Sequence, residues 1–241
     1  MLPSGWRLEV HEALPSTSDR IAAAAEAGEP AGLAVIAREQ TAGRGRAGRA
    51  WSSPPGNLYC SMLLRPGGPA REAGQWSLLA GLALAEAAGE IDPEPAALRL
   101  KWPNDLLRHG AKCAGILAET ALDPEGGLAW LCLGIGVNLA HAPELPDRPT
   151  TCLGGIEAPE AFAARLIARL DHWARRRAAE GFGPVRAGWL ALGPAPGTRI
   201  SLREGPVEGG AFAGLAEDGA LLLDCAGRRH AIRSGEIERL G

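Results

Sequence analysis

Apolar residues recur along the chain at two spacings, and each spacing predicts a different kind of element. Residues 16–30 start with serines suited to capping, continue through alanines and end in a Gly and a Pro, which predicts a helix. Residues 71–90 and 159–182 have the length and apolar spacing of longer helices. Shorter apolar runs predict strands at residues 31–40, 57–65, 97–103, 113–120 and 128–140.

The composition changes at residues 191–200, ALGPAPGTRI, where two prolines and two glycines interrupt the helical pattern. Beyond it, short apolar runs separated by glycine turns are typical of strands. We therefore expect two domains, a larger one at residues 1–193 and a small β domain, the size of an SH3-like barrel, at residues 194–241.

Charge and cysteine content narrow the class of protein. The net charge of -3 argues against a general affinity for nucleic acid, because that affinity depends on basic residues that neutralise phosphates. The N-terminal segment lacks the features of a secretory signal, and no apolar run approaches the ~20 residues of a membrane span. We expect a cytoplasmic protein with no membrane or nucleic-acid partner. The five cysteines form no C-x-x-C pair, which favours buried free thiols over a zinc site or a disulfide framework.

A basic, glycine-rich stretch at residues 39–51, EQTAGRGRAGRAW, contains the pattern G-x-G-x-x-G at residues 43–48. A dinucleotide-binding fold would need a helix to follow, but Pro54 and Pro55 exclude one. An RNA-binding Arg-Gly segment would normally recur in a disordered context, whereas this one occurs once, between two predicted strands. Two interpretations stay open: a solvated basic loop, or a loop whose amides and guanidinium groups close over a small anionic ligand.

The two lysines of the chain, Lys101 and Lys112, lie within one short region, LKWPNDLL followed by KCAGILAE. Pro103 favours an extended conformation for the residue before it, and Asn104-Asp105 is expected to turn the chain. All other Lys/Arg positions of the protein are arginines, so two lysines in this region suggest compact ammonium charges placed to bind phosphate. The alternative is that they are remnants of compositional drift.

The chain contains four segments in a fixed order, GRGRAGRAW, KWPNDLL, KCAGILAE and GIGVNLA. On these segments, the chain resembles the catalytic core of biotin–protein ligases from residue 16 to residue 138. The C-terminal strands resemble the small SH3-like domain of that family. The resemblance implies an α+β fold: a mixed β-sheet ligase core with flanking helices, plus a small C-terminal SH3-like β-barrel. Some members carry an N-terminal winged helix-turn-helix that represses transcription. Fifteen residues precede Ser16, too few for that domain, so we expect a form without it.

The resemblance implies acyl adenylation followed by transfer. Biotin and ATP, with Mg²⁺ as cofactor, would give biotinyl-5′-AMP and pyrophosphate, and a lysine of a biotin carboxyl carrier protein or carboxylase domain would then take the biotinyl group. Lys112 and Arg46 would be catalytic. Biotin would be bound by Ser16, Thr17, Ser18, Gln40, Gly43, Arg44, Gly45, Arg46, Lys112 and Gly115, and ATP by Arg46, Arg49, Trp51, Asn104, Asp105 and Asn138.

Some details of the implied site are not assigned by the resemblance. Ser18 stands where the family often has asparagine, which leaves the role of this position open. The metal ligands are unknown, although Asp105 is a candidate partner for Mg²⁺ or for a lysine. The chain has no G-x-x-x-x-G-K-[ST] sequence, so the phosphates are not expected to bind in a P-loop. A monomer and a homodimer are both compatible with the resemblance.

The resemblance also gives the Arg-Gly stretch a role. A flexible loop would admit the substrates and then close over the adenylate, which shields the mixed anhydride from water. A lipoate or octanoyl transferase is similar in fold but would need an elongated apolar pocket, and a biotin-binding or nucleic-acid-binding module would carry out no chemistry. Pyrophosphate release that depends on biotin distinguishes these alternatives.

Overall fold

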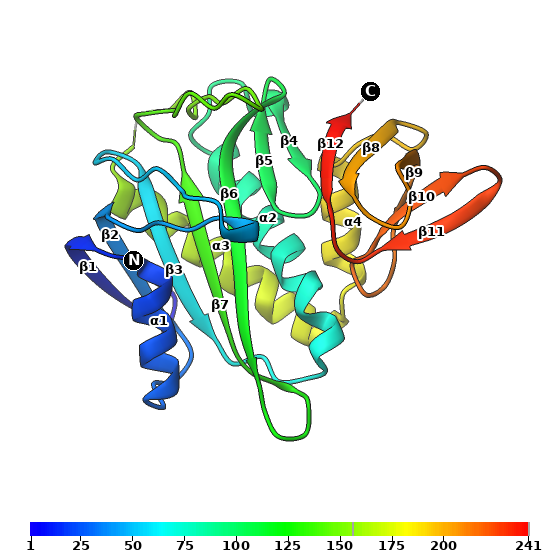
Figure 1. The fold of residues 1–241 in the computed structure, drawn as a ribbon. Coiled ribbons are helices and arrows are strands. Elements are labelled where there is room, and N and C mark those ends of the chain that lie inside the picture. Colours follow the sequence, from blue (N-terminus) through cyan, green and yellow to red (C-terminus); the bar gives the residue numbers. More distant parts are fainter. Residues whose placement is uncertain (156, 241) are drawn as a thin grey trace.

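The computed structural model describes residues 1–155 and 157–240. Figure 1 shows a large sheet with helices on both faces, beside a smaller sheet at the C-terminal end. The elements of the larger part are β1 (Arg7–Leu14), α1 (Thr17–Glu26), β2 (Leu33–Gln40), β3 (Leu58–Leu64), α2 (Ala73–Gly89), β4 (Leu98–Lys101), β5 (Asp105–Arg108), β6 (Ala111–Leu122), β7 (Leu128–Val137), α3 (Pro159–Glu180) and α4 (Gly183–Leu192), with single 3₁₀ turns at η1 (Arg46–Gly48), η2 (Ala70–Glu72) and η3 (Pro95–Ala97).

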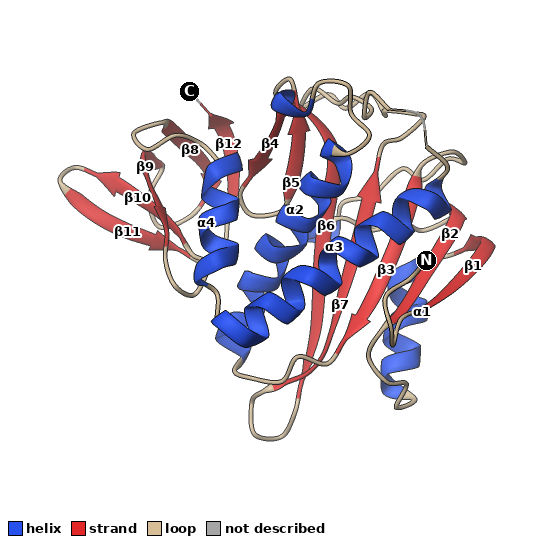
Figure 2. Ribbon diagram, turned by 180° about the vertical axis from the view of Figure 1, so that it is seen from behind, coloured by secondary structure: helices blue, strands red, loops and turns tan. Residues whose placement is uncertain are grey.

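Seven strands form one mixed sheet in the order β1-β2-β3-β7-β6-β5-β4. β1 and β2 are parallel, and the other neighbouring strands are antiparallel. Helices α2 and α3 cover one face of this sheet (Figure 2), whereas α1 packs on the opposite face against β2, β3 and β7. On the α1 face, the segment that contains η1 crosses β6 (Figure 1).

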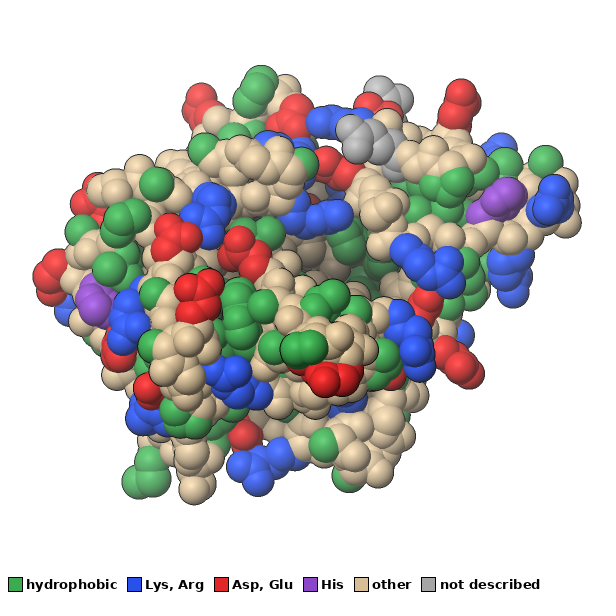
Figure 3. Space-filling view, turned by 60° about the horizontal axis from the view of Figure 1, so that its bottom comes forward, with side chains coloured by type: hydrophobic (Ala, Val, Ile, Leu, Met, Phe, Trp, Pro, Cys, Tyr) green, Lys and Arg blue, Asp and Glu red, His purple; other side chains and the backbone are tan. Residues whose placement is uncertain are grey.

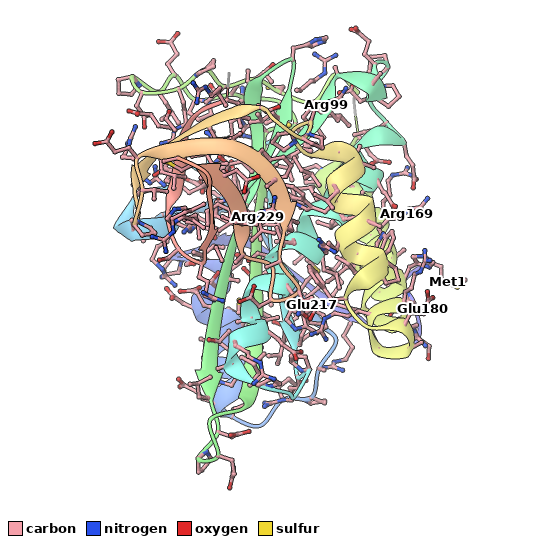
Figure 4. All side chains as sticks on the ribbon, turned by 90° about the vertical axis from the view of Figure 1, so that its right-hand side faces the viewer. Met1, Arg99, Arg169, Glu180, Glu217 and Arg229 are labelled. Atoms are coloured by element: carbon pink, nitrogen blue, oxygen red, sulfur yellow. The ribbon has the colours of Figure 1, made fainter. Side chains whose placement is uncertain are left out.

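The two long helices differ in composition because they differ in environment. Most residues of α2 are buried, since it is enclosed by the sheet, α3 and α4. Helix α3 is amphipathic: Phe162, Leu166 and Leu170 are fully buried at helical spacing. Its polar face carries Arg169 and Glu180, which point away from the sheet in Figure 4. The predicted helical pattern of this segment is therefore confirmed.

The smaller sheet contains five antiparallel strands in the order β11-β10-β9-β8-β12. They are β8 (Arg199–Glu204), β9 (Gly209–Leu215), β10 (Leu221–Cys225), β11 (Arg228–Ile232) and β12 (Glu236–Leu240). A barrel closes only when its two edge strands pair, and within the described residues 197–240 no pairing joins β11 to β12. The predicted fold class is confirmed, with the correction that this sheet is open and not a closed barrel.

Hydrogen bonds and apolar contacts fix the smaller sheet against the larger part. The indole N–H of Trp102 donates to Gly219 O (3.2 Å), and the amide of Gln75 donates to Glu217 O (2.8 Å). Both acceptors lie in the turn between β9 and β10. One hydrophobic cluster runs through both parts of the chain, from the α2 region to Phe212 on β9 and Leu223 on β10. The small sheet therefore has a defined position beside α2 and α4.

Among the described residues, the larger part contains every helix and strand that was predicted for it, and besides the 3₁₀ turns it contains two strands and one α-helix that were not predicted. β1, RLEVHEAL, carries charged residues on an edge strand; β5 is only four residues long; and α4 contains two glycines and a proline. All five cysteines are free. Cys60, Cys113 and Cys132 are buried as expected, whereas Cys152 and Cys225 are only partly buried, contrary to the prediction. Within the part of the chain that the structure describes, no helix combines the length and the apolar character needed to cross a membrane.

Candidate active site

A cavity of about 660 Å³ lies on the α1 face of the large sheet, over β6 and β7. Its walls come from segments far apart in the sequence: the start of α1, the Arg-Gly stretch, the β4–β5 turn and the segment after β7. The small sheet adds Glu236 and Ile237 from β12. Figure 3 shows the surface hollowed between the larger part and the small sheet, with basic side chains beside the hollow. Both parts of the chain therefore contribute to one cavity.

Neutral hydrogen-bonding groups line one end of the cavity. Ser16 caps α1 by accepting a hydrogen bond from the backbone N–H of Ser18 (3.3 Å). Gln40, the last residue of β2, accepts hydrogen bonds at Oε1 from the N–H (2.9 Å) and the Oγ1 (3.1 Å) of Thr17. Ser61 on β3 lies 2.7 Å from Thr17 Oγ1 and 3.1 Å from Ser18 Oγ. All four hydroxyl residues are buried.

Glycines in β6 and β7 let an aromatic ring lie directly against the sheet. A Cβ atom added to Gly136 would lie 2.5 Å from the ring of Trp51, and one added to Gly115 would lie 3.1 Å from it. Gly115 and Gly136 are paired neighbours on β6 and β7. Any larger residue at Gly136 would therefore displace Trp51 from the floor of the cavity.

The opposite end of the cavity is cationic. Lys112 Nζ donates a hydrogen bond to Asp105 Oδ1 at 2.6 Å and lies 5.4 Å from the centroid of the Trp51 ring. Burial lowers the pKa of Lys101 and the pKa of Arg46, both of which line the cavity. The Arg46 guanidinium nevertheless stays charged, since arginine is not deprotonated in proteins. This end is therefore suited to an anion.

The two ends are arranged along β7. Gly134 pairs with Ser61, and its Cβ position would be 2.8 Å from Ser18 Oγ, so Gly134 marks the hydroxyl end. Gly136, two residues on, faces the same side of the sheet and lies beneath Trp51. Successive strand residues rise ~3.3 Å, so the hydroxyl end is separated from the ring by about 7 Å along the strand. A ligand lying on β7 would span both ends.

Ion pairs fasten the Arg-Gly loop, residues 43–50. Arg44 pairs with Asp19 on α1 (2.6 Å) and with Glu119 on β6 (3.3 Å). Inside the loop, η1 is a single 3₁₀ turn with Ala47 at a φ of 55°, and no α-helix lies between it and β3, a segment that the structure describes in full. The rejection of the dinucleotide fingerprint is therefore confirmed.

The C-terminal sheet supplies acceptors for three arginines of the cavity. Arg46 Nη2 donates to the carbonyl of Gly235 at 3.3 Å. Glu236 Oε1 lies 2.9 Å from Arg49 Nη1 and 2.9 Å from Arg148 Nη2. Burial raises the pKa of Glu236, but the hydrogen bond from Arg49 and the charge of Arg148 outweigh burial and hold this pKa below its ordinary value. Glu236 is therefore ionised at neutral pH and links two loops of the larger part to β12.

All residues predicted for the site line this cavity. Two of them have contacts that stabilise the local backbone: the Asn104 amide donates to Ile116 O (2.7 Å), and the Asn138 amide donates to Thr151 O (3.1 Å). Other lining residues were not predicted as site residues from the sequence, among them Ser53, Tyr59, Ser61, Pro143, Leu145, Asp147, Arg148, Thr150, Glu236 and Ile237. A lone polar residue inside an apolar strand was an available signal for Ser61, whereas no sequence signal points to Arg148 or Glu236.

The carboxylates of the cavity already have cationic partners. Asp105 pairs with Lys112, and Arg148 pairs with both Asp147 and Glu236. Among the described residues, no group of three His, Cys, Asp or Glu side chains is arranged to hold a metal. Mg²⁺ usually keeps several waters and binds one or two carboxylates together with substrate phosphates. These side chains do not fit an all-protein Mg²⁺ site, so the ion would have to be held mainly by a nucleotide.

Comparison with known proteins connects this cavity to a family. Residues 11–138 match the family model described as "Biotin/lipoate A/B protein ligase family". The chain belongs to this family. Residues 197–240 match a second model, "Biotin protein ligase C terminal domain". Both parts of the chain therefore match a family model.

Individual relatives match over most of their length. The biotin–[acetyl-CoA-carboxylase] ligase of Paracoccus denitrificans is 40% identical over 213 residues, covering 84% of this chain and 88% of that protein. The ligase of the same name from Mycobacterium tuberculosis is 36% identical over 250 residues, covering 98% and 91%. The solved structure of the biotin protein ligase from Aquifex aeolicus in complex with biotin and ATP has a TM-score of 0.77 and 27% identity, and the match covers 96% of this chain and 97% of that one.

Proposed function

We propose that this member of the family is a biotin–protein ligase, which activates biotin with ATP to biotinyl-5′-AMP and transfers the biotinyl group to a lysine of a biotin carboxyl carrier protein. The observation that carries the proposal is the division of one cavity into a neutral hydrogen-bonding end and a cationic end, with Trp51 between them. Biotin has the same division, because a ureido ring with N–H and C=O groups is joined by an alkyl chain to a carboxylate.

The neutral end favours biotin over lipoate, the other ligand class in the name of the family. The ring of lipoate carries sulfur atoms and no N–H or C=O group. It would leave the buried Ser16 and Ser18 hydroxyls facing a ligand that offers them no hydrogen bond, which costs about 1–3 kcal/mol for each buried polar group left unpaired. The hydrogen bonds at this end therefore act as a specificity filter in the proposed reaction.

In the first step, a carboxylate oxygen of biotin attacks the α-phosphorus of ATP, and the bond from that phosphorus to the bridging oxygen of pyrophosphate breaks. An anion approaches a polyanion, so preorganised cations lower the barrier. Lys112 and Arg46 line the cationic end and are proposed to hold the carboxylate and the α-phosphate together. Substrate oxygens would replace Asp105 as partners of the Lys112 ammonium.

In the second step, the amine of the carrier lysine attacks the acyl carbon, an amide forms and AMP leaves. Until the carrier arrives, the mixed anhydride must be kept from water. The Arg-Gly loop is proposed to do this by lying over the adenylate, with Arg46 and Arg49 already directed toward β12. The C-terminal domain, proposed as residues 194–241, would thus help close the site that residues 1–193 form.

Mg²⁺ is proposed to enter with ATP as the counterion of its phosphates, in keeping with the paired state of the cavity carboxylates. The proposal includes no nucleic-acid or membrane partner, in line with the net charge of -3. It places the enzyme in the cytoplasm with its carrier, as a monomer or a homodimer.

The direct test incubates the purified protein with ATP, Mg²⁺ and biotin and measures pyrophosphate release and biotinyl-AMP by mass spectrometry. We expect both to depend on biotin, and lipoate in place of biotin to give neither. Pyrophosphate release with lipoate alone would favour a lipoate ligase. Binding of biotin without pyrophosphate release would reduce the protein to a biotin-binding module.

A further inference from the structure

A chain of side-chain hydrogen bonds passes beneath the hydroxyl end of the cavity. It runs from Ser53 through Gln40 and Thr17 to Ser61 and Ser18, with consecutive polar atoms 2.7 to 3.1 Å apart. Ser61 is fully buried, and Thr17 and Ser18 have exposed fractions of 3% and 5%. Water is therefore excluded from most of the chain, and each hydroxyl proton must be placed on a protein acceptor or on a ligand.

The first anchor of this chain is the backbone N–H of Thr17, which can only donate. It lies 2.9 Å from Gln40 Oε1, and a flipped amide would place an NH₂ group against this donor. The orientation of the Gln40 amide is therefore fixed, with Nε2 donating to Ser53 Oγ at 3.0 Å. The Ser53 proton goes to the carbonyl of Trp51 at 3.0 Å, which can only accept.

The hydroxyl protons of Thr17, Ser61 and Ser18 are then assigned in turn, each pointing to the preceding residue of the hydrogen-bond chain. Thr17 Oγ1 faces Gln40 Oε1, an acceptor, so the single Thr17 hydroxyl proton is used there. Toward Ser61, Thr17 Oγ1 can then only accept, so the Ser61 proton points to Thr17. Ser61 Oγ in turn can only accept from Ser18, so the Ser18 proton points to Ser61. The Ser18 hydroxyl therefore donates its only proton to Ser61 and presents only lone pairs to the cavity.

We infer that Ser61 is a positioning residue for ligand recognition, which makes the Ser18 hydroxyl an obligatory hydrogen-bond acceptor for a ring N–H of the ligand. This inference rests on the proposed function, since the ureido N–H of biotin is the donor concerned. Ser61 touches Thr17 and Ser18, and it acts on the ligand through them. It also gives a role to serine at position 18, where an asparagine amide could donate or accept.

The Ser16 hydroxyl complements this arrangement. Its oxygen accepts from the backbone N–H of Ser18 at 3.3 Å, so its proton is directed elsewhere. Among the described residues the structure assigns no acceptor to that proton, and Ser16 lines the cavity. One hydroxyl that accepts and one that donates then face a ligand that carries both an N–H and a C=O, which is the pattern of a ureido ring.

The test is the Ser61→Ala variant, assayed for biotin-dependent pyrophosphate release. Without Ser61, the Ser18 proton is free to rotate into the cavity, where it opposes the ligand N–H. We expect KM for biotin to rise about tenfold, the cost of one hydrogen bond and its misplaced partner. kcat should change less than threefold, because the reacting carboxylate lies at the other end of the cavity. Ser61→Thr, which keeps the hydroxyl, should restore most of the affinity.

Two further measurements separate recognition from a structural role. Biotin methylated at either ureido nitrogen lacks one N–H, so the factor by which methylation weakens binding in the parent should shrink in Ser61→Ala for one of the two isomers. Ser18→Ala removes the acceptor itself, so the factor by which methylation weakens binding should shrink for the same isomer. This variant therefore tests the N–H contact even if Ser61→Ala does not fold. Ser201→Ala, the same deletion on β8 of the other sheet, is the matched control and should leave KM unchanged.

The outcomes distinguish this inference from the proposed function. A parent that releases pyrophosphate with biotin, together with folded Ser61→Ala and Ser18→Ala variants of unchanged KM, overturns the positioning role alone. An equal loss for biotin and for both methylated isomers also overturns it, because the chain would then support the fold and not the N–H contact. A parent that is inactive with biotin overturns the proposed function and the inference together.

Discussion

Lys112 is held in place before any substrate arrives. Its ammonium lies 2.6 Å from Asp105, and the two side chains have exposed fractions of 14% and 10%. Removing either partner of such a buried pair leaves the other charge uncompensated, which is destabilising in itself. A substitution at Lys112 therefore has two effects, one on the reaction and one on Asp105, and they must be measured separately.

We predict that Lys112→Ala slows biotinyl-AMP formation by about 10²–10³-fold, since this is the usual effect of removing one preorganised group that stabilises developing charge. Pyrophosphate release under single-turnover conditions measures it. In the double variant Lys112→Ala/Asp105→Asn, the uncompensated carboxylate is gone, so the melting temperature should recover while the rate stays low. A double variant that regains the parent rate would show that Lys112 acts through Asp105 and not on the substrates.

At the scale of single residues, the sequence was sufficient to predict the site residues that lie inside contiguous motifs. Every residue predicted from the Arg-Gly and lysine segments lines the cavity. The residues it missed have a function only through partners that are distant in sequence: Glu236 meets Arg49 across 187 residues, and Ser61 meets Thr17 across 44. A motif records local spacing, so contacts of this kind become visible only when the fold brings the segments together.

Among the elements, β5, the segment between α2 and β4 and the segment after β7 are joined by one buried carboxylate. Asp92 accepts hydrogen bonds from Arg108 Nε (2.7 Å) on β5 and from the backbone N–H of Gly154 (3.0 Å), and its side chain is fully buried. Burial raises the pKa of Asp92, but these hydrogen bonds outweigh burial and hold the pKa below its ordinary value. The pair therefore joins three segments that bound the β4–β5 region.

We predict that Asp92→Ala lowers the free energy of unfolding by about 3–5 kcal/mol, the usual result of breaking a buried ion pair. A carboxyl whose folded pKa is depressed stabilises the fold above its unfolded pKa of about 3.9 and loses that contribution as the pH falls through the folded value. Urea unfolding of parent and variant should thus differ by a constant amount from pH 7 to about pH 5 and converge below about pH 4. A difference that already shrinks near pH 6 would contradict the depressed pKa.

The elements that the sequence did not predict share a physical reason. β1 and β5 are short or polar strands whose stability comes from pairing with β2, β4 and β6, and α4 is a glycine-containing helix held by Val185 and Trp189, which are buried against α2. Local propensity is weak in such segments, and tertiary packing decides. The long apolar helices and the central strands carry their own signal, which is why they were predicted.

The Arg-Gly loop gives the next prediction. Arg46 joins this loop to Gly235, and it lies 3.5 Å from Asn104 Oδ1. Arg46→Gly removes both contacts and adds backbone freedom that favours an open loop. We predict that the variant still forms the adenylate but releases it, so that it biotinylates bulk albumin, whereas the parent labels only its carrier. Incubation with ATP, biotin and albumin followed by a streptavidin blot measures the difference.

Two controls define that result. Arg46→Ala lacks the guanidinium without adding glycine's freedom, so its albumin labelling should lie between that of the parent and that of Arg46→Gly. Arg71→Gly changes a surface arginine of η2 outside this loop and should match the parent. Equal albumin labelling by parent and Arg46→Gly, with adenylate still produced, would show that Arg46 does not retain the intermediate.

At the scale of the whole molecule, the cavity is completed by the domain that is last in the sequence. Glu236 on β12 receives Arg49 from the Arg-Gly loop and Arg148 from the segment after β7. Both arginines line the cavity, so one carboxylate couples two walls of the site to the position of the small sheet. Because that sheet is fixed against α2 by Gln75 and against the β4–β5 turn by Trp102, the coupling is to the body of the protein and not to a free arm.

We predict that Glu236→Gln uncouples the two chemical steps. The amide loses the charge that attracts Arg49 and Arg148, so both loops open more often and the adenylate escapes. Each partly exposed ion pair contributes up to about 1 kcal/mol, so the dissociation rate of biotinyl-AMP should rise about 3- to 10-fold and carrier biotinylation should fall correspondingly. Pyrophosphate release at saturating biotin should stay near the parent rate, because Lys112 and Asp105 are untouched.

Glu238→Gln is the matched control, since this exposed residue lies two positions along the same strand and its substitution makes the same change in charge. Release rates measured by chasing bound radiolabelled adenylate would contradict the coupling if the Glu236 and Glu238 variants behaved alike.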